Sequence, residues 1–161
     1  MDKSNITNIS LRPSWKQLLT DRFKCILLHI MAVLCIGIAN RTIMLCGTAI
    51  ALICFALLLM RLWYLTSVVW AITDTQIKYT RGVINKNVDY MELYRIIDYQ
   101  EKQDIIQQMM GIKDVIIVSG DKSHPILRIY GIKNNLDIIG YINTRVEQAK
   151  KERKIYEITN R

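Results

Sequence analysis

The feature that most constrains this chain is a long apolar stretch near its N-terminus. Between Lys24 and Arg61, Arg41 is the only side chain that is charged at neutral pH. A helix that crosses a bilayer needs about 20 mostly apolar residues, and residues 42–60 meet this requirement. The sequence therefore predicts an integral membrane protein.

A second, shorter apolar segment precedes this one, over residues 25–39. Snorkelling of Lys24 and Arg41 toward the headgroups would let it cross with local thinning of the bilayer. Only Asn40 and Arg41 separate the two segments, which leaves room for a tight turn and nothing more. We therefore expect a two-helix transmembrane hairpin over residues 23–65.

The basic residues flank the apolar stretch. Lys16, Arg22 and Lys24 are among those that precede it, and Arg61 follows it. Because positive charge stays on the cytoplasmic side, both termini and the folded part of the chain are expected in the cytoplasm. The same four cations are the candidate contacts for anionic lipid headgroups.

Two readings of single residues in this stretch stay open. Gly37 and Ala39 resemble the small residues of a signal-peptidase site, but the polar segment before the apolar run, residues 1–22, is long for a signal peptide. His29 is either a helix-packing hydrogen bonder or an intramembrane functional group. Neither span holds an acid that could relay a proton with it, which favours packing.

Composition argues against several functional classes. The formal net charge is +8, but the flanking positions of the cations explain it by membrane topology, and no basic run interleaved with aromatics indicates nucleic-acid binding. All four cysteines lie inside the apolar stretch without a CxxC pair, so neither a disulfide framework nor a zinc site is expected.

Catalytic motifs are equally weak. The segment Gly120–Ser123 lacks the earlier spaced glycine of a phosphate-binding loop, and Ser119 lacks a GxSxG context. His124 is expected to be an exposed loop residue. We predict that the protein is not an enzyme and has no cofactor or metal.

The chain after the apolar stretch alternates like a β domain. The segments predicted as strands are 67–73, 77–80, 84–90, 95–101, 115–118 and 126–130. A short helix over 104–110 is predicted, with Asp104 as its cap and Gly111 in left-handed geometry at its end.

A longer helix is predicted from Asn134 or Asn135 to about Lys154, with Asp137 in its first turn. Its apolar face is expected to carry Leu136, Ile139, Ile142 or Asn143, Val146 and Ala149. Before the membrane segment, Pro13 opens a short interfacial helix whose apolar face would hold Trp15, Leu18, Leu19 and Phe23.

Several short motifs, in order, carry a resemblance. They are Arg12-Pro13-Ser14, Ala71-Ile72-Thr73-Asp74, Arg81-Gly82-Val83, Arg95-Ile96 and Gln107-Gln108-Met109-Met110-Gly111-Ile112. Their order and spacing resemble the bacterial membrane-flanked PH-like domain family, with two N-terminal transmembrane helices. The residues that define the resemblance are Thr73, Asp74, Gly82, Arg95, Ile96 and Gly111.

The resemblance implies an α+β fold: a two-helix transmembrane hairpin followed by a PH-like antiparallel β barrel or sandwich with a C-terminal helix. The expected divisions are a cytoplasmic N-terminal or interfacial segment (1–22), the transmembrane hairpin (23–65), the PH-like domain (66–154) and a tail (155–161). The resemblance also places the chain in the bacterial cytoplasmic membrane.

PH-like folds host several kinds of binding, so the family does not define an activity. We expect a membrane-anchored binding or assembly module that contacts a membrane or cytoplasmic protein, or a second copy in a homo-oligomer. The alternative is a lipid-sensing or membrane-stress protein that binds anionic lipid. The first hairpin turn, at Thr73-Asp74-Thr75, carries an acid and no cation, which disfavours specific phosphoinositide binding.

Overall fold

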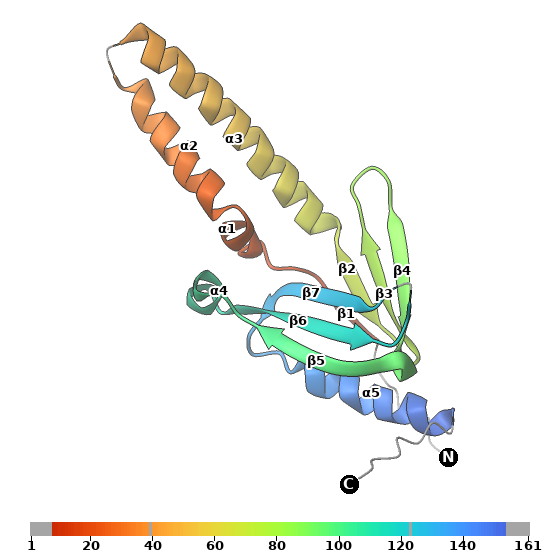
Figure 1. Cartoon of the computed structure of the whole chain (residues 1–161). Helices are drawn as coiled ribbons and strands as arrows, with labels where there is room; N and C mark the ends of the chain where they lie inside the picture. Colours follow the sequence, from red (N-terminus) through yellow and green to blue (C-terminus); the bar gives the residue numbers. More distant parts are fainter. Residues whose placement is uncertain (1–7, 39, 123, 154–161) are drawn as a thin grey trace.

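The computed structural model describes residues 8–38, 40–122 and 124–153. Seven strands form two antiparallel sheets, and a helix pair projects from them (Figure 1). The elements are β1 Ile9–Leu11, α1 Gln17–Asp21, α2 Phe23–Ile36, α3 Arg41–Ser67, β2 Val69–Ile72, β3 Gln76–Arg81, β4 Asn87–Glu92, a 3-10 turn η1 Leu93–Arg95, β5 Ile96–Lys102, α4 Ile105–Met110, β6 Ile112–Ser119, β7 Ile126–Lys133 and α5 Ile138–Glu152. The predicted α+β architecture is confirmed.

The projecting helices α2 and α3 pack against each other along their length (Figure 1). A side chain at Gly47 would place its Cβ 2.9 Å from the carbonyl oxygen of Ala32, so glycine permits the close approach of the two helices. Asn40 caps α3, because its side-chain oxygen accepts hydrogen bonds from the backbone N–H groups of Thr42 and Ile43.

Among the described residues, α3 is the one helix long and apolar enough to cross a bilayer. Its apolar side chains are largely exposed, for example Leu52 at 69% and Met60 at 66%, so it is not the core helix of a folded domain. The helix α2 is also apolar but has 14 residues. That both helices cross the membrane stays a prediction.

The boundaries of the two helices differ from the predicted ones. The second helix runs to Ser67 rather than Leu65, and Arg41 is its first residue instead of part of the turn. Val68 alone separates α3 from β2, so the strand expected from Ser67 begins at Val69. Helix propensity in the Leu-rich run therefore outweighs the β-branched character of its end.

The strand β1 was not predicted. It pairs antiparallel with β2, with Ile9 opposite Ile72 and Leu11 opposite Trp70. Residues 9–11 thus belong to the first sheet, whose strand order is β1-β2-β3-β4, and not to a separate N-terminal segment. The helices α1, α2 and α3 are inserted between two neighbouring strands of this sheet.

The second sheet has the order β5-β6-β7. Its strands β5 and β6 are joined by α4, which Asp104 and Gln107 start with a reciprocal capping box and Gly111 ends at φ 66°. The predicted helix end at Gly111 is therefore confirmed. The core between the sheets includes Trp70, Ile72, Ile77, Val115, Ile117 and Ile129.

The C-terminal helix α5 packs against one end of this core (Figure 1). It begins at Ile138, later than predicted, because Asp137 is its N-cap and accepts a hydrogen bond from Gly140 N at 2.9 Å. The predicted buried face was partly wrong: Ile138 is buried in place of Leu136, which is 39% exposed. Ile142, Val146 and Ala149 are buried as expected. The predicted tail, 155–161, lies outside the described residues.

Candidate functional site: a cleft at the base of the helices

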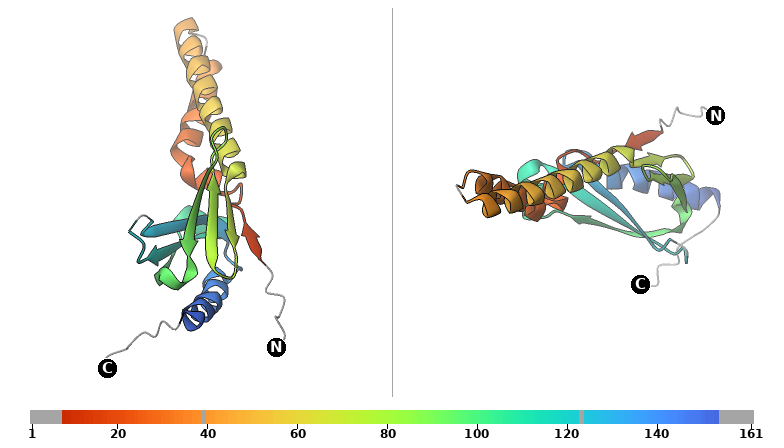
Figure 2. Two further views of the ribbon diagram at one scale, coloured as in Figure 1. Left: turned by 90° about the vertical axis from the view of Figure 1, so that its right-hand side faces the viewer. Right: turned by 90° about the horizontal axis from the view of Figure 1, so that it is seen from above.

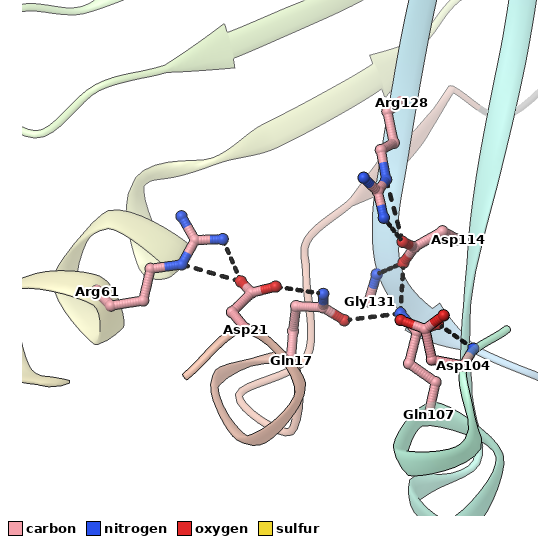
Figure 3. A network of polar contacts seen from close by, with 8 residues as sticks. All are labelled: Gln17, Asp21, Arg61, Asp104, Gln107, Asp114, Arg128 and Gly131. Atoms are coloured by element: carbon pink, nitrogen blue, oxygen red, sulfur yellow. Dashed lines mark hydrogen bonds and ion pairs between the residues drawn. The ribbon is translucent and has the colours of Figure 1, made fainter. Parts of the chain in front are cut away.

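Three side chains link the N-terminal segment to the end of α3. Asp21, the last residue of α1, accepts a hydrogen bond from Gln17 Nε2 at 2.8 Å on one carboxylate oxygen. Its other oxygen forms an ion pair with Arg61 of α3 (Figure 3). Two guanidinium N–H groups of Arg61 donate to this one oxygen, which fixes the orientation of the Arg61 side chain as well as pairing the two charges. The segment before the helices is thereby fastened to the helix that follows.

The same network continues into the β domain through Gln107 of α4 (Figure 3). The Gln107 side chain is 1% exposed. Its Nε2 lies 3.2 Å from Gln17 Oε1 and 2.8 Å from Asp114 Oδ1. Its Oε1 accepts from Asp104 N at 2.9 Å. One buried amide therefore connects α1, the cap of α4 and strand β6.

Asp114 is the buried carboxylate at the centre of this network, with no exposed surface. It also accepts from Gly131 N at 2.9 Å and pairs with Arg128 of β7 at 2.5 Å. A buried carboxylate needs this number of donors to offset its desolvation. Gly131 has φ 66°, and a Cβ there would lie 2.8 Å from Gln17 Cβ, so glycine allows α1 to rest on β7.

A cleft of about 390 Å³ opens beside this network. Its walls come from β3 and β4 of the first sheet and from β7, an edge strand of the second sheet. Asp21 and Arg61 line it at the base of the helices. The cleft thus lies where the β domain meets the helical stalk, which consists of α2 and α3.

Aromatic side chains form the inner wall of the cleft. Tyr79 stacks on the buried Trp70 with ring centres 5.6 Å apart, and Tyr130 meets the same indole edge-on at 4.9 Å. The Arg61 guanidinium lies 5.1 Å from the ring centre of Tyr64 and 5.9 Å from that of Tyr130. Such cation–aromatic contacts stabilise a charge next to an apolar wall.

The phenols of this wall stay neutral donors. Burial, and then the neighbouring Tyr64, raises the pKa of Tyr79, although Arg81 opposes the change. Burial likewise raises the pKa of Tyr130, with Tyr79 adding to the effect. The buried Tyr130 hydroxyl has no hydrogen-bond partner within the described part of the chain. The hydroxyl oxygen is covered by neighbouring atoms, so it is not a contact point for a bound group.

The cations of the cleft already have partners. Arg61 pairs with Asp21, and Arg81 pairs with Asp89 at 3.1 Å. Arg128 pairs with the buried Asp114 (above). The cleft is therefore close to electrically balanced, whereas a site for a multiply charged phosphate needs converging cations with capacity to spare. Its lining suits a neutral or zwitterionic group with apolar and hydrogen-bonding parts.

A scan against family models matches residues 25–146 to the bacterial PH domain family. The chain belongs to the bacterial PH domain family. The matched range includes most of α2, all of α3 and most of the β domain, which agrees with the resemblance drawn from the sequence motifs. Searches of curated proteins and of solved structures found no match.

In this bacterial PH domain, the four predicted lipid or topology cations do not form one site. Arg61 enters the cleft through its pair with Asp21, and Lys16 Nζ donates to the Met110 carbonyl oxygen at 2.8 Å. Arg22 and Lys24 are exposed around the start of α2. Two of the four therefore make structural contacts, and two remain exposed to solvent.

The residues that define the resemblance lie at turns and strand ends of the PH domain. Thr73 closes the β2–β3 turn by donating its hydroxyl to the Gln76 carbonyl oxygen at 2.7 Å, and Asp74 lies in that turn. Gly82 turns the β3–β4 hairpin at φ 109°. Arg95 and Ile96 mark the entry to β5. They shape the domain and do not converge on the cleft.

Sequence reasoning missed most residues of the network, namely Gln17, Asp21, Gln107, Asp114 and Arg128. One clue was available: Asp114 interrupts the apolar run of β6, where an unpaired acid would be costly. His124 is exposed, as predicted, and lines the cleft. His29 Nδ1 lies 3.1 Å from the Ala51 carbonyl oxygen of α3, which agrees with the packing interpretation.

No group of three or more His, Cys, Asp or Glu side chains in residues 8–38, 40–122 and 124–153 is arranged to hold a metal ion.

Proposed function

We propose that this protein is a membrane-anchored binding module whose α2–α3 pair crosses the bacterial cytoplasmic membrane as a hairpin. The pairing of β1 with β2 supports the hairpin, because it joins the chain just before α2 to the chain just after α3. Two ends that form one sheet lie on one side of a membrane. The flanking cations support a cytoplasmic location for that side.

We infer that the cleft at the base of the helices binds a segment of a protein, either of another membrane protein or of a second copy. The observation that carries this is the paired state of its arginines, which leaves the aromatic side chains that line the cleft as the means of recognition. Aromatic residues with a polar atom are typical anchors of protein interfaces. The module acts by binding, with no catalytic step.

The test uses the full chain in its native membrane. A photo-crosslinking amino acid replaces Tyr90 or Ile126, which line the cleft and are 49% and 63% exposed. The matched control is Ile97 on β5, which is 68% exposed and outside the cleft. We expect light-dependent protein adducts from the two cleft positions and none from the control.

The mass of the adduct distinguishes a second copy from another protein. The proposal fails if the cleft positions yield only lipid adducts, or the same adducts as Ile97. Lipid adducts that increase with the anionic lipid content of the membrane would favour the alternative function, headgroup sensing, over protein binding.

A further inference from the structure

Helix α4 presents two apolar side chains to solvent. Ile105 and Met109 are each 77% exposed and lie four residues apart, on one face of the helix. Exposed apolar pairs of this kind are unfavourable in water. Ile106, next to Ile105, is half-buried and lines a surface groove with Phe23, Lys24 and Cys25 at the start of α2.

Because α4 and the start of α2 line the same groove, α4 lies close to the base of the helices. The first turn of α2 is where the chain enters the apolar stretch, and α4 lies directly beside it. Lys16 strengthens this placement by its 2.8 Å hydrogen bond to Met110. Figure 1 shows α4 next to α1 at the base of the helices. The exposed pair on α4 is therefore at the level where the membrane begins.

A second apolar point lies across the domain, at the tip of the β3–β4 hairpin. Ile84 in this turn is 89% exposed, and Lys86 beside it is also exposed. Figures 1 and 2 show the hairpin pointing to the same side of the domain as the helices, beside the end of α3. An isoleucine followed by a lysine is a combination suited to the membrane interface.

The strand register relates this tip to the interface. Val69 pairs with Thr80, and Ile84 follows Thr80 by four residues. Trp63 precedes Val69 by six residues on α3 and is 63% exposed. Tryptophan concentrates at the headgroup level of spanning helices. Both Ile84 at the hairpin tip and Trp63 on α3 therefore extend from the Val69–Thr80 pair, on the side of the domain from which the helices project.

We propose that the PH domain has a second contact with the lipid surface, formed by Ile105 and Met109 on α4 and by Ile84 at the hairpin tip. These two points lie on either side of the helical stalk and enter the headgroup region together. They hold the domain against the bilayer at a fixed tilt, so that it does not swing on its anchor. The inference rests on the proposed membrane anchoring by α3.

The experiment places single spin labels on the full-length protein in liposomes of zwitterionic and anionic phospholipid. The four native cysteines are replaced by alanine, and circular dichroism checks that the fold is kept. Labels are attached at Ile84→Cys and Ile105→Cys, with Ile97→Cys on β5 as the exposed control. Leu52→Cys on α3 reports the anchor itself. Collision rates with oxygen, which enters lipid, and with a water-soluble nickel chelate are compared.

We expect the ratio of oxygen to nickel collisions at residues 84 and 105 to exceed that at residue 97 at least threefold. Ratios equal to the control at either position, with Leu52 still lipid-exposed, overturn the second contact and leave the anchor intact. A nickel-accessible label at Leu52 refutes the anchor, and the inference with it.

Discussion

Replacing Gln107 by methionine tests whether the buried network holds the stalk to the β domain. The two side chains are similar in size, so the core is not emptied. The substitution removes the Nε2 donor of Gln17 Oε1 and Asp114 Oδ1 and the Oε1 acceptor of Asp104 N, while Asp114 keeps its bonds to Gly131 and Arg128.

Each polar group stranded in this way costs about 1–3 kcal/mol. Two such groups, one of them on a Gln17 side chain that is 2% exposed, lower the free energy of unfolding by roughly 2–4 kcal/mol. For a chain of this size, each kcal/mol shifts the melting temperature by about 2–4 °C. The expected fall in Tm is on the order of 5–15 °C, measured by circular dichroism of the full chain in detergent.

The neighbouring residue supplies the control. Gln108 is exposed and makes one long bond, 3.4 Å, to the Gln103 carbonyl oxygen. Gln108→Met therefore changes the free energy of unfolding by no more than about 0.5 kcal/mol. Equal Tm values for the two variants would refute the structural role of the network. A double-mutant cycle with Gln17→Met is expected to give a coupling energy above about 0.5 kcal/mol.

Backbone strain, a buried phenol and topology give three further tests. Gly111 and Gly131 share φ 66°, but a Cβ meets nothing within 4 Å at Gly111 and lies 2.8 Å from Gln17 Cβ at Gly131. In thermal melts Gly111→Ala should cost about 1 kcal/mol and Gly131→Ala more; equal losses would contradict the close packing of α1. Burial, with Glu147 adding to it, raises the pKa of Tyr99 to about 12. The neutral phenol therefore stabilises the fold, and this stability is lost as the pH rises from the unfolded value near 10 through the folded value. Tyr99→Phe should reduce the alkaline loss of stability in melts between pH 9 and 12, leaving the part due to Tyr79 and Tyr130, and an unchanged pH profile would argue against it. A reporter active only outside the cytoplasm, fused to the C-terminus, should be silent, and strong activity would rule out the hairpin.

The parts of the fold that the sequence predicted well are those with a local cause. For α4, the cap residue Asp104 before the helix and Gly111 after it are sufficient to predict where the helix begins and ends. The period-two pattern around Val88 and Tyr90 similarly predicted a strand. In each case the neighbouring residues alone determine the backbone.

The parts that were missed depend on partners far along the chain. The three residues of β1 are too few to show a period, and they become a strand because Trp70 and its neighbours offer a free edge. Gln107 reads as an ordinary polar helix residue until Gln17, 90 positions away, is placed against it. The cleft combines residues from α1, α3, β3, β4 and β7, so no short motif could describe it.

The placement of β1 before the helices, and of its partner β2 after them, has a consequence for biosynthesis. In the proposed hairpin topology, residues 9–11 leave the ribosome before β2, and their sheet cannot close until Trp70 lies on the same face of the membrane. A chain whose helices enter the bilayer in the wrong orientation, or singly, keeps the two strands apart. The edge of β2 then stays unpaired, and such an edge invites aggregation or proteolysis. In the proposed topology, pairing of β1 with β2 therefore requires that both helices insert in the correct orientation.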